Sequence, residues 1–361
     1  MKNILPAVLA LILFSACNST PEKAKPSPYP ETRKSDHTDE YFGTTVADPY
    51  RWLEDDLSDE TANWVKAQNK VTFDYLDYIP FRKDVKERLK EVIDYPVITA
   101  PRKHGDYFYY RRNSGLQNQS VRYRKKGEDG QEEVFLDPNK FTEDGTISLA
   151  GGSFTKDGSL YGFLISEGGS DWRKVIVLNT EDKTIVGDTL VNVKFGTVSW
   201  KGNDGCYNSS YDKPKEGSVL SAKTQYHKLY YHKLGTPQSS DKLIFGGEAQ
   251  PRRYIFAGVS EDERYLIISA ATNTTGNELY IKDLSKKNSP IVQVVDNFDQ
   301  THSYVHNEGT TLFIQTDLNA PNTKLIKVDA RNPQPENWVD VISETENVAG
   351  NEAAGGNIFA N

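Results

Sequence analysis

The sequence is poor in cysteine and methionine, with two cysteines and one methionine in 361 residues. Two cysteines cannot build a disulfide framework, and without a Cys-x-x-Cys pair there is no sign of a structural zinc site. An excess of positive charge is also missing, because 43 Lys and Arg stand against 51 Asp and Glu. The net charge of −8 argues against a general nucleic-acid binder.

A long hydrophobic run occurs only at the N-terminus, where Ile4–Ala16 carries no charge. These 13 residues are fewer than the roughly 20 of a membrane-spanning helix, so we interpret residues 1–16 as a signal peptide. Phe14-Ser15-Ala16-Cys17 resembles a bacterial lipobox, which predicts a lipoprotein anchored in membrane lipid through Cys17. An ordinary signal peptide cleaved nearby is the alternative. Residues 17–30, rich in Ser, Thr, Lys and Pro, are typical of a disordered tether.

Helical periodicity is found only in the segment that follows the tether. Apolar side chains recur every three or four residues on both sides of Pro80, and Asp94-Tyr95-Pro96 ends the pattern because the residue before a proline is pushed out of the helical region. We therefore predict a small N-terminal helical segment over residues 31–98. The apolar positions are Trp64, Ala67, Val71, Tyr75 and Tyr78, and then Phe81, Val85, Leu89 and Val92.

The rest of the chain, residues 99–361, predicts strands and repeats itself about every 50 residues. Twenty Tyr, 15 Phe and 26 Gly favour many short strands joined by turns. An acidic or glycine turn followed by an aromatic-rich strand recurs at positions 106, 157, 204, 262 and 309. A second strand signal recurs between these turns, as Val121-Arg122-Tyr123, Val175-Ile176-Val177, Leu229-Tyr230-Tyr231, Leu279-Tyr280-Ile281 and Leu325-Ile326-Lys327. Such a period is the size of a four-stranded β-propeller blade.

A sixth repeat begins at Gly355-Gly356-Asn357-Ile358-Phe359, just before the sequence stops. A propeller protects its edges by closing, so we interpret residues 99–361 as a partial propeller truncated in its sixth blade.

Nine short motifs along the chain, in the same order, resemble the prolyl oligopeptidase family of serine peptidases. The resemblance runs from about Tyr29 to the last residue. The motifs include Asp48-Pro49-Tyr50-Arg51-Trp52-Leu53-Glu54-Asp55, Ala67-Gln68-Asn69, Gly115-Leu116-Gln117-Asn118-Gln119, Phe135-Leu136-Asp137-Pro138-Asn139, Gly169-Ser170-Asp171-Trp172, Val193-Lys194-Phe195 and Lys228-Leu229-Tyr230-Tyr231-His232.

The resemblance implies a helical N-terminal segment, a seven-bladed propeller that filters peptides by size, and an α/β-hydrolase domain that cuts after proline. The expected fold is thus mainly β, with about five of seven blades and no hydrolase domain. We expect no catalytic residue in this chain, because the family's Ser, Asp and His lie in that domain. The required G-x-S-x-G elbow does not occur, and its nearest match, Gly258-Val259-Ser260-Glu261-Asp262, is typical of a β-turn.

Three residues are expected by resemblance to face the substrate or the hydrolase domain. Phe195 matches an aromatic that lines the family's outer substrate pocket, although a plain core role suits it nearly as well. Tyr254 falls in the next pocket region, with a looser local match, while Ala271 and Thr272 stand where a basic pocket residue would be expected. Asp171 would face the hydrolase domain and pair with a basic group, or would simply be a turn residue.

No metal or cofactor is expected. His302 and His306 are four residues apart in a strand-like segment, which spans about 13 Å and is too far for one ion. The leading hypothesis is the propeller portion of an exported, periplasmic or cell-surface prolyl oligopeptidase, gating short proline-containing peptides but inactive alone. The alternatives are a non-catalytic surface lipoprotein that binds peptides or a protein partner, and a split enzyme completed by a separate hydrolase chain.

Overall fold

The computed structural model describes residues 28–213, 224–348, 350–354 and 357–360. The predicted signal peptide, Cys17 and nearly all of the tether lie outside the described residues, as do Gly355 and Gly356 of the sixth repeat signature. The described residues fall into two compact units, one comprising residues 28–93 and the other residues 94–213 and 224–360.

The N-terminal unit contains a hairpin and two helices. Its elements are β1 (Thr38–Tyr41), β2 (Thr44–Ala47), the 3-10 turn η1 (Arg51–Glu54), α2 (Asp59–Tyr78) and α3 (Arg82–Ile93). Helix α2 begins after Ser58, whose hydroxyl accepts a hydrogen bond from the Thr61 amide at 3.2 Å, as expected of an N-cap. No helix in the described part of the chain is long and apolar enough to cross a membrane.

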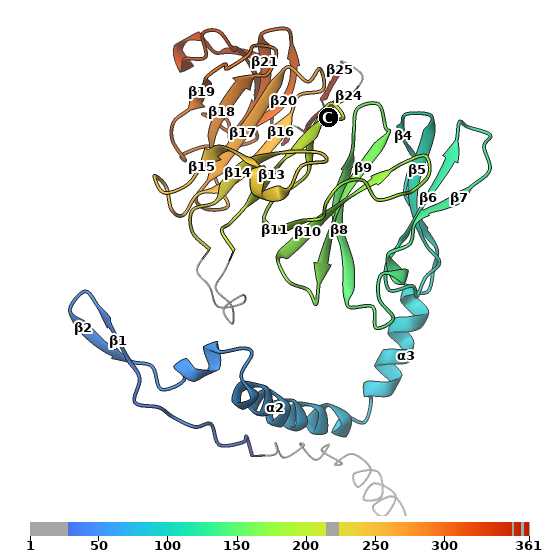
Figure 1. Ribbon diagram of the computed structural model, residues 1–361, viewed down its shortest axis with the longest axis vertical. Coiled ribbons are helices and arrows are strands. Elements are labelled where there is room, and N and C mark those ends of the chain that lie inside the picture. Colours follow the sequence, from blue (N-terminus) through green and yellow to red (C-terminus); the bar gives the residue numbers. More distant parts are fainter. Residues whose placement is uncertain (1–27, 214–223, 349, 355–356, 361) are drawn as a thin grey trace, which may run out of the picture. The chain divides into compact units, whose positions relative to one another are not determined.

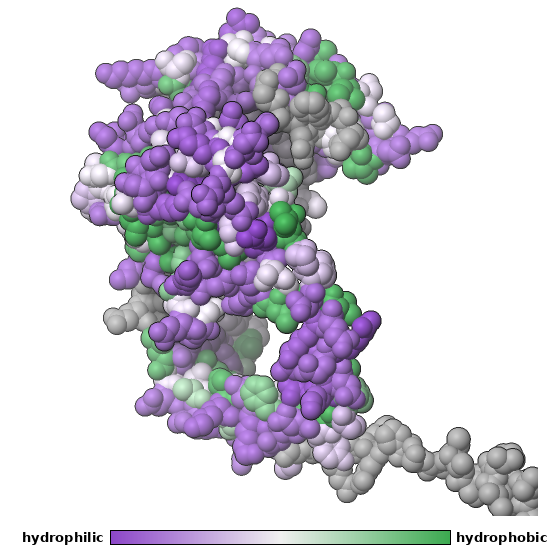
Figure 2. Space-filling view, turned by 90° about the vertical axis from the view of Figure 1, so that its right-hand side faces the viewer, coloured by the Kyte–Doolittle hydropathy of each residue, from purple (hydrophilic) through white to green (hydrophobic). Residues whose placement is uncertain are grey.

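The apolar side chains of these two helices are largely uncovered within the described residues. Helix α3 has no buried residue, and its apolar positions Phe81, Val85, Leu89 and Val92 are all exposed. Hydrophobic patches are scattered over the mainly hydrophilic surface in Figure 2.

The second unit consists of antiparallel strands that follow one another along the chain in successive groups (Figure 1), and we call each group a blade. The second and third blades are joined into one eight-stranded sheet by the pairing of Val193 with Ser210. Blade 1 contains β3 (Val97–Ile98), β4 (Arg102–His104), β5 (Tyr107–Asn113), β6 (Val121–Lys126) and β7 (Glu133–Leu136); blade 2 contains β8 (Ile147–Phe154), β9 (Leu160–Glu167), β10 (Trp172–Asn179) and β11 (Leu190–Lys194); blade 3 contains β12 (Ser199–Lys201), β13 (Gly205–Ser210), β14 (Lys228–Lys233) and β15 (Lys242–Gly246).

Two more blades and a final hairpin complete the described strands. Blade 4 contains β16 (Tyr254–Val259), β17 (Tyr265–Ala271), β18 (Glu278–Asp283) and β19 (Ile291–Val295); blade 5 contains β20 (His302–Glu308), β21 (Thr311–Thr316), β22 (Lys324–Asp329) and β23 (Val339–Ile342); the hairpin pairs β24 (Asn351–Ala354) with β25 (Asn357–Ala360). Short 3-10 turns lie at η2 (Pro138–Lys140), η3 (Gln238–Ser240) and η4 (Pro335–Asn337).

The mainly β, propeller-type fold predicted from the sequence is confirmed. In blades 2 to 5 each acidic or glycine turn of the repeat leads into the second strand and each later strand signal falls in the third. In blade 1, where β3 and β4 both pair with β5, the same signals fall in β5 and β6. Strand β3 at Val97–Ile98 pairs with β5 and so belongs to blade 1.

The hydrophobic core lies between consecutive blades rather than within any one of them. Strand β17 shows this most clearly: Tyr265 and Ile267 pack with blade 5, whereas Leu266 and Ile268 pack with blade 3. Successive side chains of a strand point to opposite faces, so one strand contributes to two cores. A blade therefore needs a neighbour on each face to bury its apolar side chains.

Aspartates of the repeated turns also join one blade to the next. Asp157 accepts hydrogen bonds from Thr155 and Ser159 within its own turn, and its second oxygen accepts one from Asn203 of blade 3 at 2.7 Å. Asp262 of blade 4 repeats the arrangement, accepting from Asn307 of blade 5 at 2.8 Å. The aspartate of the repeated turn thus also accepts a hydrogen bond that links its blade to the next one.

We expect Asp157→Ala to lower the free energy of unfolding by about 1 kcal/mol, because it removes several charge-assisted hydrogen bonds at an exposed site where solvent screens the charge. Burial alone would raise the pKa of Asp157, but the bonds from Asn203, Ser159 and Thr155 outweigh it and hold that pKa well below its usual 3.8. The carboxylate therefore stabilises the fold above about pH 4, and this contribution is lost as the pH falls further.

Urea unfolding of the two proteins at several pH values measures this difference, which should shrink below about pH 4. Asp188→Ala, at an exposed aspartate, is the matched control. Equal losses of stability in the two variants would contradict a role for Asp157 in joining the blades.

Candidate functional site

Two of the predicted site residues, Phe195 and Tyr254, come together at one end of blades 2 to 4. Phe195 directly follows β11 and Tyr254 begins β16. Their ring centroids lie 5.6 Å apart with the planes inclined at 68°, an edge-to-face contact. Both side chains are only half-buried, so their outer surfaces are available to a ligand.

The backbone around Phe195 sets the direction of its ring. Phe195 has a φ of 53°, in the left-handed region that is unfavourable for residues other than glycine, and it turns the chain sharply away from β11. At the next position a Cβ would lie 2.5 Å from the Ser209 carbonyl oxygen, so only a glycine, Gly196, fits against β13. This close crossing fixes the aromatic ring at the end of the blade.

Three further side chains extend this aromatic cluster. Tyr211 makes edge contacts with Phe195 at 6.4 Å and with Trp172 at 6.3 Å between ring centroids. The Lys194 ammonium lies 5.0 Å from the Trp172 centroid and 5.3 Å from that of Phe195, within the range of a cation–π interaction. Burial, followed by the influence of Tyr254, raises the pKa of Tyr211 to about 12, which keeps its phenol neutral.

The buried side chain of His227 packs against the aromatic cluster and holds it in place. Its ring stacks on Tyr211 at 4.4 Å, its Nδ1 accepts a hydrogen bond from the Ile255 amide, and its Nε2 donates to the Lys194 carbonyl oxygen, both at 2.9 Å. This arrangement requires a neutral imidazole protonated at Nε2, because Nδ1 must accept. Burial lowers the pKa of His227 to about 4, in keeping with that state.

Asp171 is exposed on the β9–β10 turn, next to Trp172 of the aromatic cluster. The turn is held by the Ser166 hydroxyl, which donates to the Ser170 carbonyl oxygen at 2.6 Å, and by the Trp172 amide, which donates to the Ser170 hydroxyl at 3.1 Å. The Asp171 carboxylate therefore faces solvent beside the cluster.

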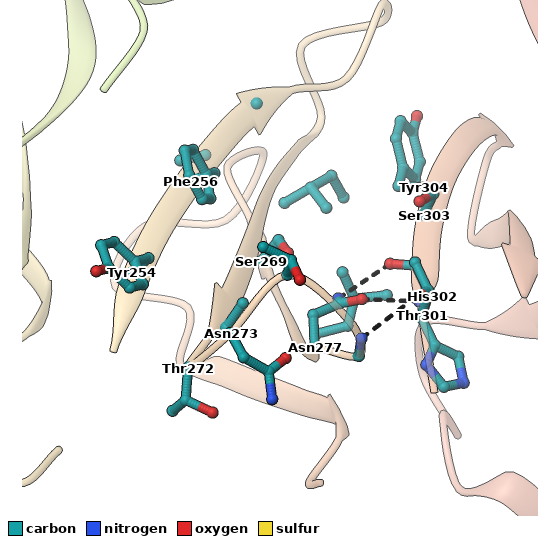
Figure 3. A pocket seen from close by; sticks show the side chains of 17 residues that line it. Tyr254, Phe256, Ser269, Thr272, Asn273, Asn277, Thr301, His302, Ser303 and Tyr304 are labelled. Carbon is teal, nitrogen blue, oxygen red and sulfur yellow. Dashed lines mark hydrogen bonds between the residues drawn. The ribbon is translucent and has the colours of Figure 1, made fainter. Parts of the chain in front are cut away.

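An open groove of about 850 Å³ adjoins the cluster at Tyr254, between blades 4 and 5 (Figure 3). Tyr254 and Phe256 of β16 form one side, and Ser303 and Tyr304 of β20 form the other. The β17–β18 loop forms its base. No acidic or basic side chain lines the groove apart from the histidine of β20, and the described lining also includes Ser269, Ala271, Thr272, Asn273, Thr274, Asn277, Thr301 and His302.

The base of the groove is held in place by a side-chain clamp between the two blades. Asn277 donates to the His302 carbonyl oxygen at 3.0 Å and accepts from the His302 amide at 2.8 Å, as Figure 3 shows. Asn277 is itself buried. Other polar groups of the lining are also engaged within the protein: Asn273 Oδ1 accepts from the Thr275 amide, Thr301 accepts from the Gly276 amide, and the Tyr304 hydroxyl donates to Asn307.

Together the cluster and groove can hold an extended, uncharged chain by aromatic contact and by hydrogen bonding. Of the predicted positions, Phe195, Tyr254, Ala271 and Thr272 lie in this region and Asp171 beside it, while Cys17 lies outside the described residues. No group of three or more His, Cys, Asp or Glu that could hold a metal occurs in the described part of the chain.

Sequence reasoning missed Tyr211 and His227. Their contacts join blades 2, 3 and 4 and depend on the curvature between blades, which strand periodicity does not encode. The available signal was weak: a polar histidine, His227, immediately before a predicted strand.

The chain is similar to known proteins in both sequence and structure. The chain matches the family description "Prolyl oligopeptidase, N-terminal beta-propeller domain" over residues 30–359. It is 51% identical to a prolyl endopeptidase of Elizabethkingia miricola, over 99% of this chain and 50% of that protein, and 33% identical to prolyl oligopeptidase A of Amanita bisporigera, over 86% and 45%. The chain thus spans about half the length of these curated relatives.

Solved structures give the same result. A prolyl oligopeptidase B from Galerina marginata, bound to a 35mer hydrolysis and macrocyclization substrate, superposes with a TM-score of 0.77 at 28% identity, covering 91% of this chain and 50% of that one. A structure from a study of two prolyl endopeptidases superposes with a TM-score of 0.68 at 30% identity, covering 92% and 48%.

The neutral state of His227 makes the fold sensitive to acid. A histidine whose pKa is lowered by folding stabilises the native state fully above the unfolded value of 6.5 and progressively less as the pH falls toward about 4. We expect this group to remove up to about 3 kcal/mol from the free energy of unfolding over that interval.

His227→Asn keeps an acceptor near the position of Nδ1 but does not titrate, so urea unfolding should show a smaller loss of stability between pH 6.5 and 4 than in the wild type. His37→Asn, at an exposed histidine, should follow the wild type. A parallel pH dependence in His227→Asn and the wild type would show that this ring is not the acid-sensitive group.

Proposed function

Because the chain belongs to the prolyl oligopeptidase family through its N-terminal β-propeller domain, we propose that it is the peptide-selecting part of a serine-type prolyl peptidase. The observation that carries this proposal is the contact between Phe195 and Tyr254 beside an uncharged groove. In this proposal the propeller gates short proline-containing peptides and presents them for hydrolysis after proline.

The cluster and the groove suit the two chemical features of such a peptide. A prolyl ring or an apolar side chain packs well on the exposed surfaces of Phe195 and Tyr254. The peptide backbone has amide and carbonyl groups that can pair with Asn273, Ser303 and the other hydroxyl and amide groups of the groove. The exposed Asp171 would pair with a basic group that faces the blades.

We further propose that this chain alone does not cleave peptides. The serine nearest to an elbow pattern, Ser260, is committed to its turn: its hydroxyl donates to Asp262 at 2.6 Å and accepts from the Tyr265 amide at 2.8 Å. Ser260 is also buried. Attack on the proline carbonyl carbon would require a serine, a histidine and an aspartate supplied by residues outside this chain.

Peptide binding tests the selecting role. We expect a blocked proline-containing peptide to quench the intrinsic fluorescence of the chain saturably, since Trp172 adjoins the cluster. Phe195→Ala and Tyr254→Ala should each weaken binding by about tenfold, as expected for loss of an aromatic contact and its buried area.

Tyr75→Ala, at an exposed aromatic of α2, is the matched control and should bind like the wild type. Equal affinity in all the variants would refute the assignment of this surface. Turnover of the peptide that is abolished by a serine-directed inhibitor would refute the claim that the chain is inactive alone.

We also propose export and lipid anchoring through Cys17, on the basis of the lipobox-like sequence that precedes it. When the protein is expressed in a bacterium supplied with labelled palmitate, we expect label in the wild type and none in Cys17→Ser. Cys206→Ser, at the buried cysteine, is the control and should remain labelled. Equal labelling of Cys17→Ser and the wild type would exclude acylation at this position.

A further inference from the structure

A second cleft, of about 570 Å³, lies between blades 1 and 2 and has a different chemical character from the groove. Three arginines, Arg102, Arg111 and Arg122, and one histidine, His104, line it. Its other lining residues in the described chain are uncharged: Thr99, Ala100, Tyr109, Tyr110, Gly152, Ser153 and Phe154. In a chain with a net charge of −8, this cleft is a local concentration of positive charge without a lining carboxylate.

Two of these arginines are placed directly opposite each other. Arg111 of β5 and Arg122 of β6 are cross-strand partners, so their side chains leave the sheet on the same face. Like charges in such a pair repel, and the repulsion from Arg111, after burial, contributes to lowering the pKa of Arg122. A negative charge between the two guanidinium groups would offset this repulsion.

Within the described residues, none of the three arginines has a carboxylate partner. Other arginines of the same blade do: Arg112 pairs with Glu132 at 2.9 Å, and Arg124 pairs with Glu133 at 2.6 Å. Arg111 and Arg112 are adjacent on β5 and point to opposite faces of the sheet, yet only Arg112 has a carboxylate partner among the described residues. Blade 1 therefore neutralises the arginines outside the cleft and leaves those that line it uncompensated.

Buried donors without a hydrogen-bond partner in the described chain lie at and behind the cleft: the Arg122 Nε and the Tyr109 hydroxyl belong to its lining, and the Tyr161 hydroxyl lies behind it. The Arg122 guanidinium lies over the Tyr161 ring, 5.3 Å from its centroid, so the Arg122 and Tyr161 side chains are neighbours. Gly152 separates the cleft from the Tyr161 hydroxyl, and a Cβ there would lie only 2.4 Å from it. Buried donors of this kind are usually satisfied by a ligand or an ordered water.

We propose that the cleft between blades 1 and 2 binds a small oxyanion, a phosphate or a carboxylate group, through Arg111 and Arg122 with Arg102 at its mouth. The planar guanidinium forks offer paired N–H donors that match the oxygens of either group. The bound anion would offset the repulsion across β5 and β6. This site is separate from the aromatic cluster and does not depend on the proposed peptidase role.

His104 gives a spectroscopic reporter for the site. Its ring stacks on Phe154 at 4.2 Å, and burial together with the nearby Arg102 lowers its pKa. A bound anion favours the charged imidazolium and should raise that pKa. The titration of His104 by NMR therefore detects occupancy directly.

The test is a titration of the purified chain with inorganic phosphate and, separately, with acetate, at constant ionic strength adjusted with chloride. We expect one of them to bind saturably at one site per chain, to raise the pKa of His104, and to bind at least about tenfold more weakly to Arg111→Gln and to Arg102→Gln. The anion that binds identifies the group as phosphate or carboxylate.

The matched control is Arg112→Gln, the neighbour on the opposite face of β5, which should bind the anion within about twofold of the wild type. Because Arg111→Gln removes a like-charge repulsion, it should also unfold at the same temperature as the wild type or higher when no anion is present. The proposal fails if neither anion binds saturably, or if Arg112→Gln weakens binding as much as Arg111→Gln.

Discussion

Each blade of this protein has two apolar faces, and this constraint governs the rest of the structure. Strand β17 sends Tyr265 and Ile267 into one core and Leu266 and Ile268 into the next, so neither core exists without a neighbouring blade. The hydrophobic contribution to stability thus comes from stacking the sheets. The hydrogen bonds of Asp157 and Asp262 help to fix how adjacent blades are aligned, because each joins a specific turn to the following blade.

Much of this fold was predictable because the two central strands of every blade carry the strongest pattern. Strands such as β9 and β17 are buried on both faces and follow a marked turn, so they stand out in the sequence. The outer strands were harder to find, since β15 and β23 are short and mostly exposed and lack a clear alternation. The β1–β2 hairpin, exposed along nearly all its length, gave no hydrophobic signal either.

The candidate site was less predictable than the fold, because its residues meet only through the curvature between blades. Resemblance to a family singled out Phe195 and Tyr254, and the structure brings their rings into contact. The role of His227 could not be inferred in that way, because its ring bonds to the backbone of Lys194 and of Ile255, which belong to different blades. Nor did the sequence reveal that Arg111 and Arg122 face each other, since that depends on the pairing of β5 with β6.

Both candidate binding regions occur between adjacent blades, in a space that the core does not fill. The groove is lined by strands β16, β17, β18 and β20, and the arginine-lined cleft by β4, β5 and β6 of blade 1 and β8 of blade 2. Some lining residues, Tyr109 in the cleft and Ile267 and Leu279 in the groove, also belong to the cores, whereas the arginines of the cleft and the hydroxyl and amide side chains of the groove do not. A substitution of one of these polar side chains changes the ligand chemistry without removing a core residue, which explains how one repeated architecture carries an uncharged groove at one interface and a cationic cleft at another.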